Sequence, residues 1–240
     1  MPKPFGLDAA DFSTHRDTRR ALRRLLSPRW LYLLSRRLDP LSESVGQDRG
    51  TPVDRPYIES FLSHHRAAIT GRVLEIKDRD YTQRFGTNVS ASAVLDFNKD
   101  NTAADIYDDI RSLATIPDNS YDCFIVTQVL QYVDDLTASA RHIHRVLAPG
   151  GTALITVPTL GKLDGTEDNV EGSFWRMTAD AATFLFAPHF HDLEVVPWGN
   201  VRLAVAFLTG MCVQDLSHAE LTHFDARYTC GVLIRATKSR

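Results

Sequence analysis

The chain has 240 residues, of which 43% are hydrophobic and 24% are charged, and its formal net charge is −3. This composition is typical of a globular protein and excludes a globally disordered chain. The charge gives no support for binding to nucleic acid, and no apolar run reaches the roughly 18 residues of a membrane-spanning helix.

The first 50 residues are basic, with ten Lys or Arg against six Asp or Glu. Apolar residues recur at three- and four-residue steps from Leu22 to Leu34, which predicts amphipathic helix. Ser27 and Pro28 interrupt this pattern and would cap and restart the helix. We expect this segment to be a helical cap that packs on the domain or covers an active site. A surface for an acidic partner or an anionic membrane is the alternative.

From residue 54 onward, helix and strand patterns alternate. The predicted helices span residues 54–69, 135–147 and 178–187. The predicted strands span residues 72–76, 92–97, 104–109, 121–127, 152–157, 193–196 and 229–236. Such alternation predicts an α/β fold with a mostly parallel, doubly wound sheet covered by helices on both faces.

Acidic side chains stand at the ends of the first three predicted strands, at Glu75, Asp78, Asp96 and Asp109. On an open α/β sheet, ligands bind beyond the carboxyl ends of the strands. Carboxylates there accept hydrogen bonds from an amine, a ribose diol or an adenine amino group. The alternative for each acid is that it caps the next helix or turn.

Two motifs resemble those of class I S-adenosylmethionine-dependent methyltransferases, the methyltransferase type 11-like group. The first is Ile116-Pro-Asp-Asn-Ser-Tyr-Asp, and the second, at the usual distance, is Arg145-Val-Leu-Ala-Pro-Gly-Gly. The resemblance implies a Rossmann-like, seven-stranded methyltransferase domain over residues 51–240 and a helical cap segment over residues 1–50. Stretches at Asp48 and Phe174 further resemble a bacterial subgroup found beside glycosyltransferases.

The resemblance implies S-adenosyl-L-methionine as the cofactor and assigns its contacts to residues at the strand ends. Asp96 would bind the ribose hydroxyls, and Asp109 the adenine amino group. The implied cofactor-binding residues are Glu75, Lys77, Asp78, Arg79, Asp96, Asp109, Ile110, Thr127 and Gln128.

The chain departs from the family at the loop after the first strand, where Lys77, Arg79 and Tyr81 replace three glycines. Glycine serves there for positive φ and for close approach to the ligand. Either the loop still binds the cofactor, with Lys77 or Arg79 meeting its carboxylate, or the pocket is occluded. Since two cations would repel a sulfonium, we expect one of them to point away, to solvent, Asp78 or Asp80.

Methyl transfer to a hydroxyl needs a base, and the candidate catalytic residues are Asp164, Tyr132, and His189 or His191. Trp175 and Arg176 are candidate acceptor-binding residues, because an aromatic face suits a sugar and arginine suits an anion. Ordinary packing is the alternative for Trp175. The His189-Phe-His191 pair is typical of a surface feature, so we expect no metal.

The sequence therefore predicts a methyltransferase that modifies a small molecule, at a hydroxyl of a saccharide or secondary metabolite. The alternative is a catalytically inactive methyltransferase fold that serves as a scaffold for a biosynthetic partner. We expect a cytoplasmic protein, because no secretory signal is present and the three cysteines are sparse. The resemblance to the bacterial subgroup implies a bacterial protein. We expect no nucleic-acid or membrane partner, and a homodimer is left open.

Overall fold

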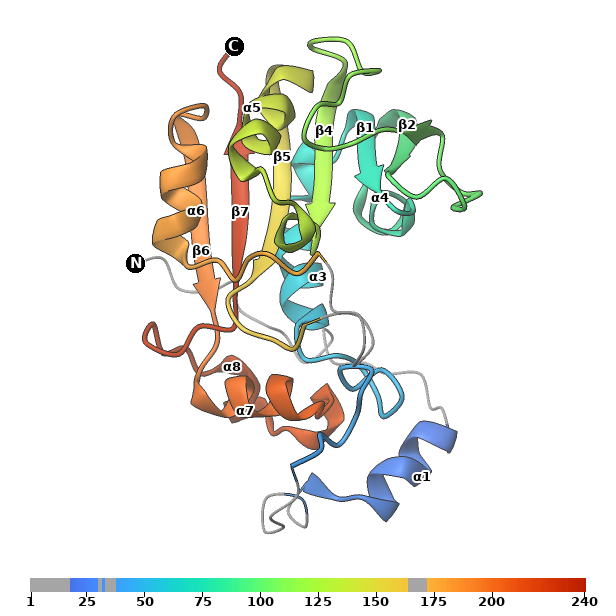
Figure 1. Cartoon of the computed structure of the whole chain (residues 1–240), viewed down its shortest axis with the longest axis vertical. Helices are drawn as coiled ribbons and strands as arrows, with labels where there is room; N and C mark the ends of the chain where they lie inside the picture. The colour runs from blue at the N-terminus through green and yellow to red at the C-terminus, as the bar shows by residue number, and fades with distance from the viewer. Residues whose placement is uncertain (1–17, 30–31, 33–37, 164–171) are drawn as a thin grey trace.

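The structure is a computed structural model that describes residues 18–29, 32, 38–163 and 172–240. The described residues form a seven-stranded sheet in the order β3-β2-β1-β4-β5-β7-β6 (Figure 1). The strands are β1 (Gly71–Ile76), β2 (Val89–Asp96), β3 (Ile106–Tyr107), β4 (Tyr121–Thr127), β5 (Leu147–Pro158), β6 (Asp192–Trp198) and β7 (Gly231–Thr237). Only β7 runs antiparallel to its neighbours, β5 and β6. The predicted mostly parallel sheet is confirmed.

Helices cover both faces of the sheet. The α-helices of the described residues are α1 (Thr18–Leu26), α3 (Arg55–His64), α4 (Asp80–Phe85), α5 (Leu136–Val146), α6 (Ala179–Phe186), α7 (Val201–Thr209) and α8 (His218–Thr222), of which α1 lies apart from the sheet. On one face, Phe124 of β4 belongs to a buried cluster with residues of α5 and α6. On the other face, Ile125 belongs to a second cluster with residues of α3 and α7. Successive strand residues point to opposite faces, so both sides of β4 are apolar.

Helices α5 and α6 both begin after a side chain that caps them. The Asp135 carboxylate accepts a hydrogen bond from Ala138 N (2.9 Å), and Thr178 Oγ1 accepts one from Ala181 N (3.2 Å). The helix predicted over residues 54–69 is shorter, however, because α3 ends at His64 and a 3-10 turn follows at Arg66–Ala68. That turn leads the chain into β1 while Ile69 stays fully buried.

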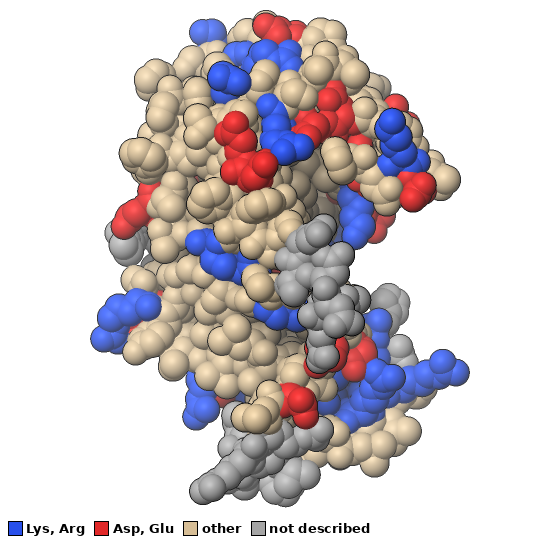
Figure 2. Space-filling view, viewed as in Figure 1, with Lys and Arg blue, Asp and Glu red and all other residues tan. Residues whose placement is uncertain are grey.

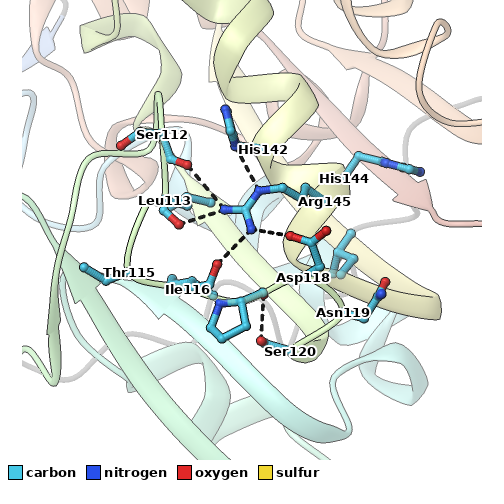
Figure 3. Close-up of polar contacts among 12 residues, drawn as sticks. Ser112, Leu113, Thr115, Ile116, Asp118, Asn119, Ser120, His142, His144 and Arg145 are labelled. Carbon is cyan, nitrogen blue, oxygen red and sulfur yellow. Dashed lines mark hydrogen bonds and ion pairs between the residues drawn. The ribbon is translucent and has the colours of Figure 1, made fainter.

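The two motifs that carry the family resemblance meet at Arg145 (Figure 3). Its guanidinium donates to the carbonyl oxygens of Leu113 (2.7 Å), Ile116 (2.8 Å) and Ser112 (3.3 Å). It also pairs with the Asp118 carboxylate at 2.6 Å. Arg145 therefore fastens the loop between β3 and β4 to the end of α5, which gives a structural reason for the pairing of the motifs.

Helix α1 and residues 38–50 lie below the carboxyl ends of the strands, on the same side of the sheet as α7 and α8 (Figure 1). Arg49, only 2% exposed, pairs with Asp215 (3.3 Å) and donates to Ser27 O (3.0 Å). Arg29 pairs with Glu220 of α8 at 3.0 Å. These contacts hold Ser27, Arg29 and Arg49 against the C-terminal part of the chain.

Helix α1 differs from the rest of this segment because it has no buried residue. Its leucines are exposed: Leu22 by 55%, Leu25 by 77% and Leu26 by 72%. Figure 2 shows Lys and Arg side chains gathered over α1, whereas acidic and basic side chains interleave over the sheet. Trp30, which the amphipathic pattern includes, lies outside the described residues. Within the part of the chain described, no helix has the length and apolarity to cross a membrane.

Candidate active site

A cleft of about 680 Å³ opens at the carboxyl ends of β1, β2, β4 and β5. β1 and β4 are neighbours in the sheet although β2 and β3 lie between them in the sequence. This is the topological switch point at which open α/β sheets bind ligands. The predicted site residues that line the cleft are Glu75, Lys77, Asp78, Asp96, Thr127, Gln128, Tyr132 and Arg176.

A second pocket of about 300 Å³ adjoins the cleft near the end of β3. Asp109 and Ile110 line it, and Asp96 and Tyr132 line both pockets. The predicted nucleoside contacts at Asp96, Asp109 and Ile110 therefore lie along one continuous edge. Ile110 is 7% exposed, so its side chain is a wall of this pocket rather than a surface group.

Glu75 is buried, with 2% exposure, and its carboxylate holds the first turn of α4. Oε1 accepts from Tyr81 N (3.1 Å), and Oε2 accepts from Thr82 N (2.8 Å) and Thr82 Oγ1 (2.6 Å). Burial raises the pKa of this carboxyl group, and the hydrogen bonds from Thr82 and Tyr81 oppose that shift. Glu75 therefore fixes the backbone at the start of α4 by accepting hydrogen bonds from the amides of Tyr81 and Thr82.

Three non-glycine residues that line the cleft have left-handed backbone conformations. Lys77 follows β1 with φ 78°, Gln128 follows β4 with φ 55°, and Val45 lies in the N-terminal segment with φ 56°. Such conformations cost about 1–3 kcal/mol each and concentrate at functional sites. The glycine that is usual after the first strand has been replaced at Lys77, but the glycine-like conformation remains.

The two loop cations point in different directions. Lys77 lines the cleft, and its ammonium makes no hydrogen bond or ion pair with the described residues. Arg79 does not line the cleft and pairs with Asp105 at 2.6 Å. One cation therefore points away, as expected, but its partner is Asp105 rather than Asp78 or Asp80.

Asp96 and Asp109 are both held by neighbouring side chains or amides. Asp96 accepts from Asn98 N (2.8 Å) and Asn101 Nδ2 (2.6 Å). Asp109 pairs with Arg111 at 2.5 Å, and this hydrogen-bonded pairing lowers the pKa of its carboxyl group. Both carboxylates are therefore oriented before any ligand binds.

On the acceptor side, the structure brings Tyr132 and Arg176 to the cleft but not Trp175. The Trp175 indole donates from Nε1 to Val133 O (2.7 Å) and lines neither pocket. Arg176 donates to Trp175 O (2.8 Å) and Lys162 O (2.6 Å). Asp164, the predicted base, lies outside the described residues.

The histidines of the His189-Phe-His191 pair line neither pocket. Within the described ranges, no group of three or more His, Cys, Asp or Glu side chains could hold a metal ion.

Several further polar residues line the cleft without having been singled out in the sequence, and Asp54 and Gln131 are two of them. Asp54 makes no capping hydrogen bond, and burial raises the pKa of its carboxyl group. Gln131, 5% exposed, donates to Gln128 O (3.0 Å), while its Oε1 has no hydrogen-bond partner among the described residues. Asp54 stands in the stretch at Asp48 that resembles the bacterial subgroup, and Gln131 follows the fourth predicted strand, so the available signals were that resemblance and the strand end.

These residues fit S-adenosylmethionine. The cleft offers oriented carboxylates for a ribose and an adenine, a cation for a carboxylate, and the unsatisfied Gln131 Oε1 for an amine. The strand order and these strand-end groups are those expected of a class I S-adenosylmethionine-dependent methyltransferase. Residues 67–155 match the family profile described as a methyltransferase domain, so the protein has such a domain and uses S-adenosylmethionine as cofactor.

Solved structures with this fold include two enzymes described as S-adenosylmethionine-dependent methyltransferases. The one from Archaeoglobus fulgidus has a TM-score of 0.51 and 14% identity, over 75% of this chain and 93% of the other. The one from Mesorhizobium loti has a TM-score of 0.50 and 15% identity, over 78% and 98%. The [4+2]-cyclase SpnF has a TM-score of 0.54 and 15% identity, over 80% and 83%. At these identities the likeness shows the fold alone. No curated protein matches the sequence.

Proposed function

We propose that the protein methylates a hydroxyl group of a small molecule, a saccharide or a secondary metabolite. The observation that carries this proposal is Asp54, a carboxylate that lines the cleft and whose pKa is raised by burial. A carboxylate with a raised pKa is a better proton acceptor, and a hydroxyl must lose its proton as it attacks. The resemblance to a subgroup found beside glycosyltransferases supports a saccharide.

In this mechanism the bound cofactor supplies a methyl group activated by its sulfonium. The protein mainly aligns the two reactants, with Asp96 and Asp109 as nucleoside ligands. Asp54 accepts the hydroxyl proton at a carboxylate oxygen and returns it to solvent. Tyr132 remains a candidate base because it is 41% exposed and lines both pockets, and Asp164 remains one from the sequence.

Two cations on the acceptor side suit an acceptor with a carboxylate or phosphate group. Lys162 and Arg176 both line the cleft. Lys162 donates to Glu43 O, and Arg176 donates to two carbonyl oxygens. Within the described part of the chain neither forms an ion pair, so their charge is available to a ligand.

The test is methyl transfer from isotopically labelled S-adenosylmethionine to a panel of glycosides, sugar nucleotides and phenols, followed by mass spectrometry. With an accepted substrate, Asp54→Asn should lower kcat by about 10²- to 10⁴-fold. Asp80→Asn, an exposed acid on α4, is the matched control and should have little effect. Wild-type kcat should rise with pH to a plateau above the raised pKa of Asp54. Unchanged turnover by Asp54→Asn would exclude it as the base.

The alternative of an inactive scaffold depends on occlusion of the cleft by the loop after β1. Against it, Tyr81 is 6% exposed and packs inward, and Arg79 points to Asp105. Binding of S-adenosylhomocysteine without methylation of any acceptor would favour the scaffold. We further propose a biosynthetic role in the bacterial cytoplasm, without a nucleic-acid or membrane partner. Sedimentation would decide between a monomer and a homodimer.

A further inference from the structure

The backbone amides of the loop after β1 are largely engaged within the protein. The amides of Tyr81 and Thr82 donate to Glu75, and that of Asp80 donates to Asp78 Oδ1 (3.0 Å). The Lys77 amide donates to Leu95 O (2.9 Å). A loop whose amides are engaged in this way has few donors for an anionic ligand, so side chains must supply that charge.

Four cationic side chains line the cleft, and they fall into two pairs. Lys162 and Arg176 follow β5, on the acceptor side. Lys77 and Arg55 lie at the end of β1, where Arg55 of α3 contacts Tyr81 of α4. Lys77 and Arg55 are therefore the cations nearest to a ligand group that is bound at the end of β1.

Arg55 is positioned by Tyr81, and the nearby carboxylates of Asp54 and Glu59 stabilise its charge without an ion pair at contact distance. Its Nη1 donates to the Tyr81 hydroxyl, and its guanidinium carbon lies 5.8 Å from the centroid of the Tyr81 ring. Its Nε and Nη2 make no hydrogen bond with the described residues, and it forms no ion pair with them. A half-buried guanidinium whose Nη1 is engaged and whose Nε and Nη2 are available is arranged for a carboxylate, which accepts hydrogen bonds from both nitrogens at once.

We propose that Arg55 binds the carboxylate of the methionine moiety of S-adenosylmethionine, with Lys77 as the second cation. This inference rests on the cofactor assignment and is independent of the acceptor. Tyr81 stands where the family has a glycine, and its hydroxyl orients Arg55. The side chains that replaced the glycine loop thus take over the function of its amides.

The experiment is titration calorimetry with two ligands, S-adenosylhomocysteine and its decarboxylated analogue S-adenosyl-3-thiopropylamine, which keeps the amine. Arg55→Gln should weaken binding of S-adenosylhomocysteine by about 10- to 100-fold, the effect of losing a charged hydrogen bond. Binding of the analogue should change by less than about 2-fold, because it has no carboxylate to lose. Tyr81→Phe should weaken the binding of S-adenosylhomocysteine by about 3- to 10-fold and leave the binding of the analogue unchanged.

Arg84→Gln is the matched control. Arg84 also lies over the Tyr81 ring, at 6.0 Å, but it pairs with Glu59 and does not line the cleft. It should leave both affinities unchanged. Thermal unfolding of each variant verifies folding, and Arg55→Lys, which keeps the charge, replaces Arg55→Gln if that variant does not fold.

Three outcomes would overturn the proposal. Equal losses for both ligands in Arg55→Gln would make Arg55 a packing residue, and no loss would exclude it from the site. Absence of S-adenosylhomocysteine binding to the wild type would remove the cofactor assignment as well. If Arg55→Gln loses affinity for S-adenosylhomocysteine only, and the wild type methylates no acceptor, the role of Arg55 in carboxylate binding is supported. Only the acceptor proposal is then contradicted.

Discussion

Lys77 occupies a backbone conformation that disfavours its side chain, with φ 78°. Replacing it by glycine removes that strain but increases the entropy of the unfolded chain. We predict that Lys77→Gly raises the free energy of unfolding by up to about 1 kcal/mol, measured by urea denaturation. The same variant should bind S-adenosylhomocysteine more weakly, because a cation has been lost.

The control for Lys77→Gly is Lys99→Gly, at a residue of the loop after β2 that is not in the left-handed region. Glycine there relieves no strain and should destabilise the protein. Equal destabilisation by both substitutions would show that the strain at Lys77 is negligible.

Asp109 is assigned to the adenine amino group and is held in place by Arg111. Asp109→Ala should weaken the binding of S-adenosylhomocysteine by about 10- to 150-fold, since a charged hydrogen bond is worth roughly 1.5–3 kcal/mol. Asp100→Ala, at an exposed acid in the loop after β2, is the control. An unchanged affinity of folded Asp109→Ala in calorimetry would show that the adenine lies elsewhere.

At the scale of elements, the loop between β3 and β4 depends on one side chain of α5. Arg145 donates to three carbonyl oxygens and pairs with Asp118. We predict that Arg145→Met lowers the free energy of unfolding by about 2–4 kcal/mol, because these acceptors lose their donors. Arg141→Met, at an exposed position of the same helix, should stay within about 0.5 kcal/mol. Similar urea midpoints for the two variants would contradict this account.

The contact between Arg29 of the N-terminal segment and Glu220 of α8 should stabilise the protein less at low pH. The Arg29 guanidinium and the groups of Ser217 lower the pKa of Glu220 from 4.5 to about 2. A lowered folded-state pKa stabilises the protein above pH 4.5, and that contribution is lost as the pH falls through 2. The stability difference between wild type and Arg29→Met should therefore shrink between pH 5 and pH 2. Arg202→Met, an exposed control on α7, should show no such trend.

The elements that the sequence predicts are those with a strong apolar signal. The run at residues 121–127 predicts β4 because that strand is buried on both faces. Helix α7 was missed because it is apolar almost throughout: Val201 and Leu208 are 50% and 53% exposed, so no polar face marks it as a helix. The short helices α4 and α8 give too few residues for a period.

The same limit applies to the site. Residues at strand ends, such as Asp96 and Gln128, are predictable because topology places them at the cleft. Arg55 lies on α3, which reaches the cleft only through tertiary packing. The periodicity of the sequence predicts the helix but not its position at the cleft. Trp175 was predicted for the acceptor pocket, but its indole instead satisfies the carbonyl of Val133.

At the scale of the whole molecule, the N-terminal segment borders the acceptor side. A pocket of about 300 Å³ between Leu38, Pro40 and Phe207 of α7 shares Val45 and Lys162 with the main cleft. Removing residues 1–40 should leave a folded core that binds S-adenosylhomocysteine but turns over its acceptor slowly. Removing residues 1–17 is the control. Normal turnover after the longer deletion would exclude a lid, and failure to fold would place the segment in the core.

The position of β7 between β5 and β6 has a consequence for synthesis of the protein on the ribosome. The nascent chain makes β1 to β5 first, and the edge of β5 stays unpaired while β6, α7 and α8 emerge. That edge belongs to an apolar strand, which is the kind of surface that pairs with other chains. Translation that stalls before β7 should therefore yield a chaperone-dependent, aggregation-prone intermediate.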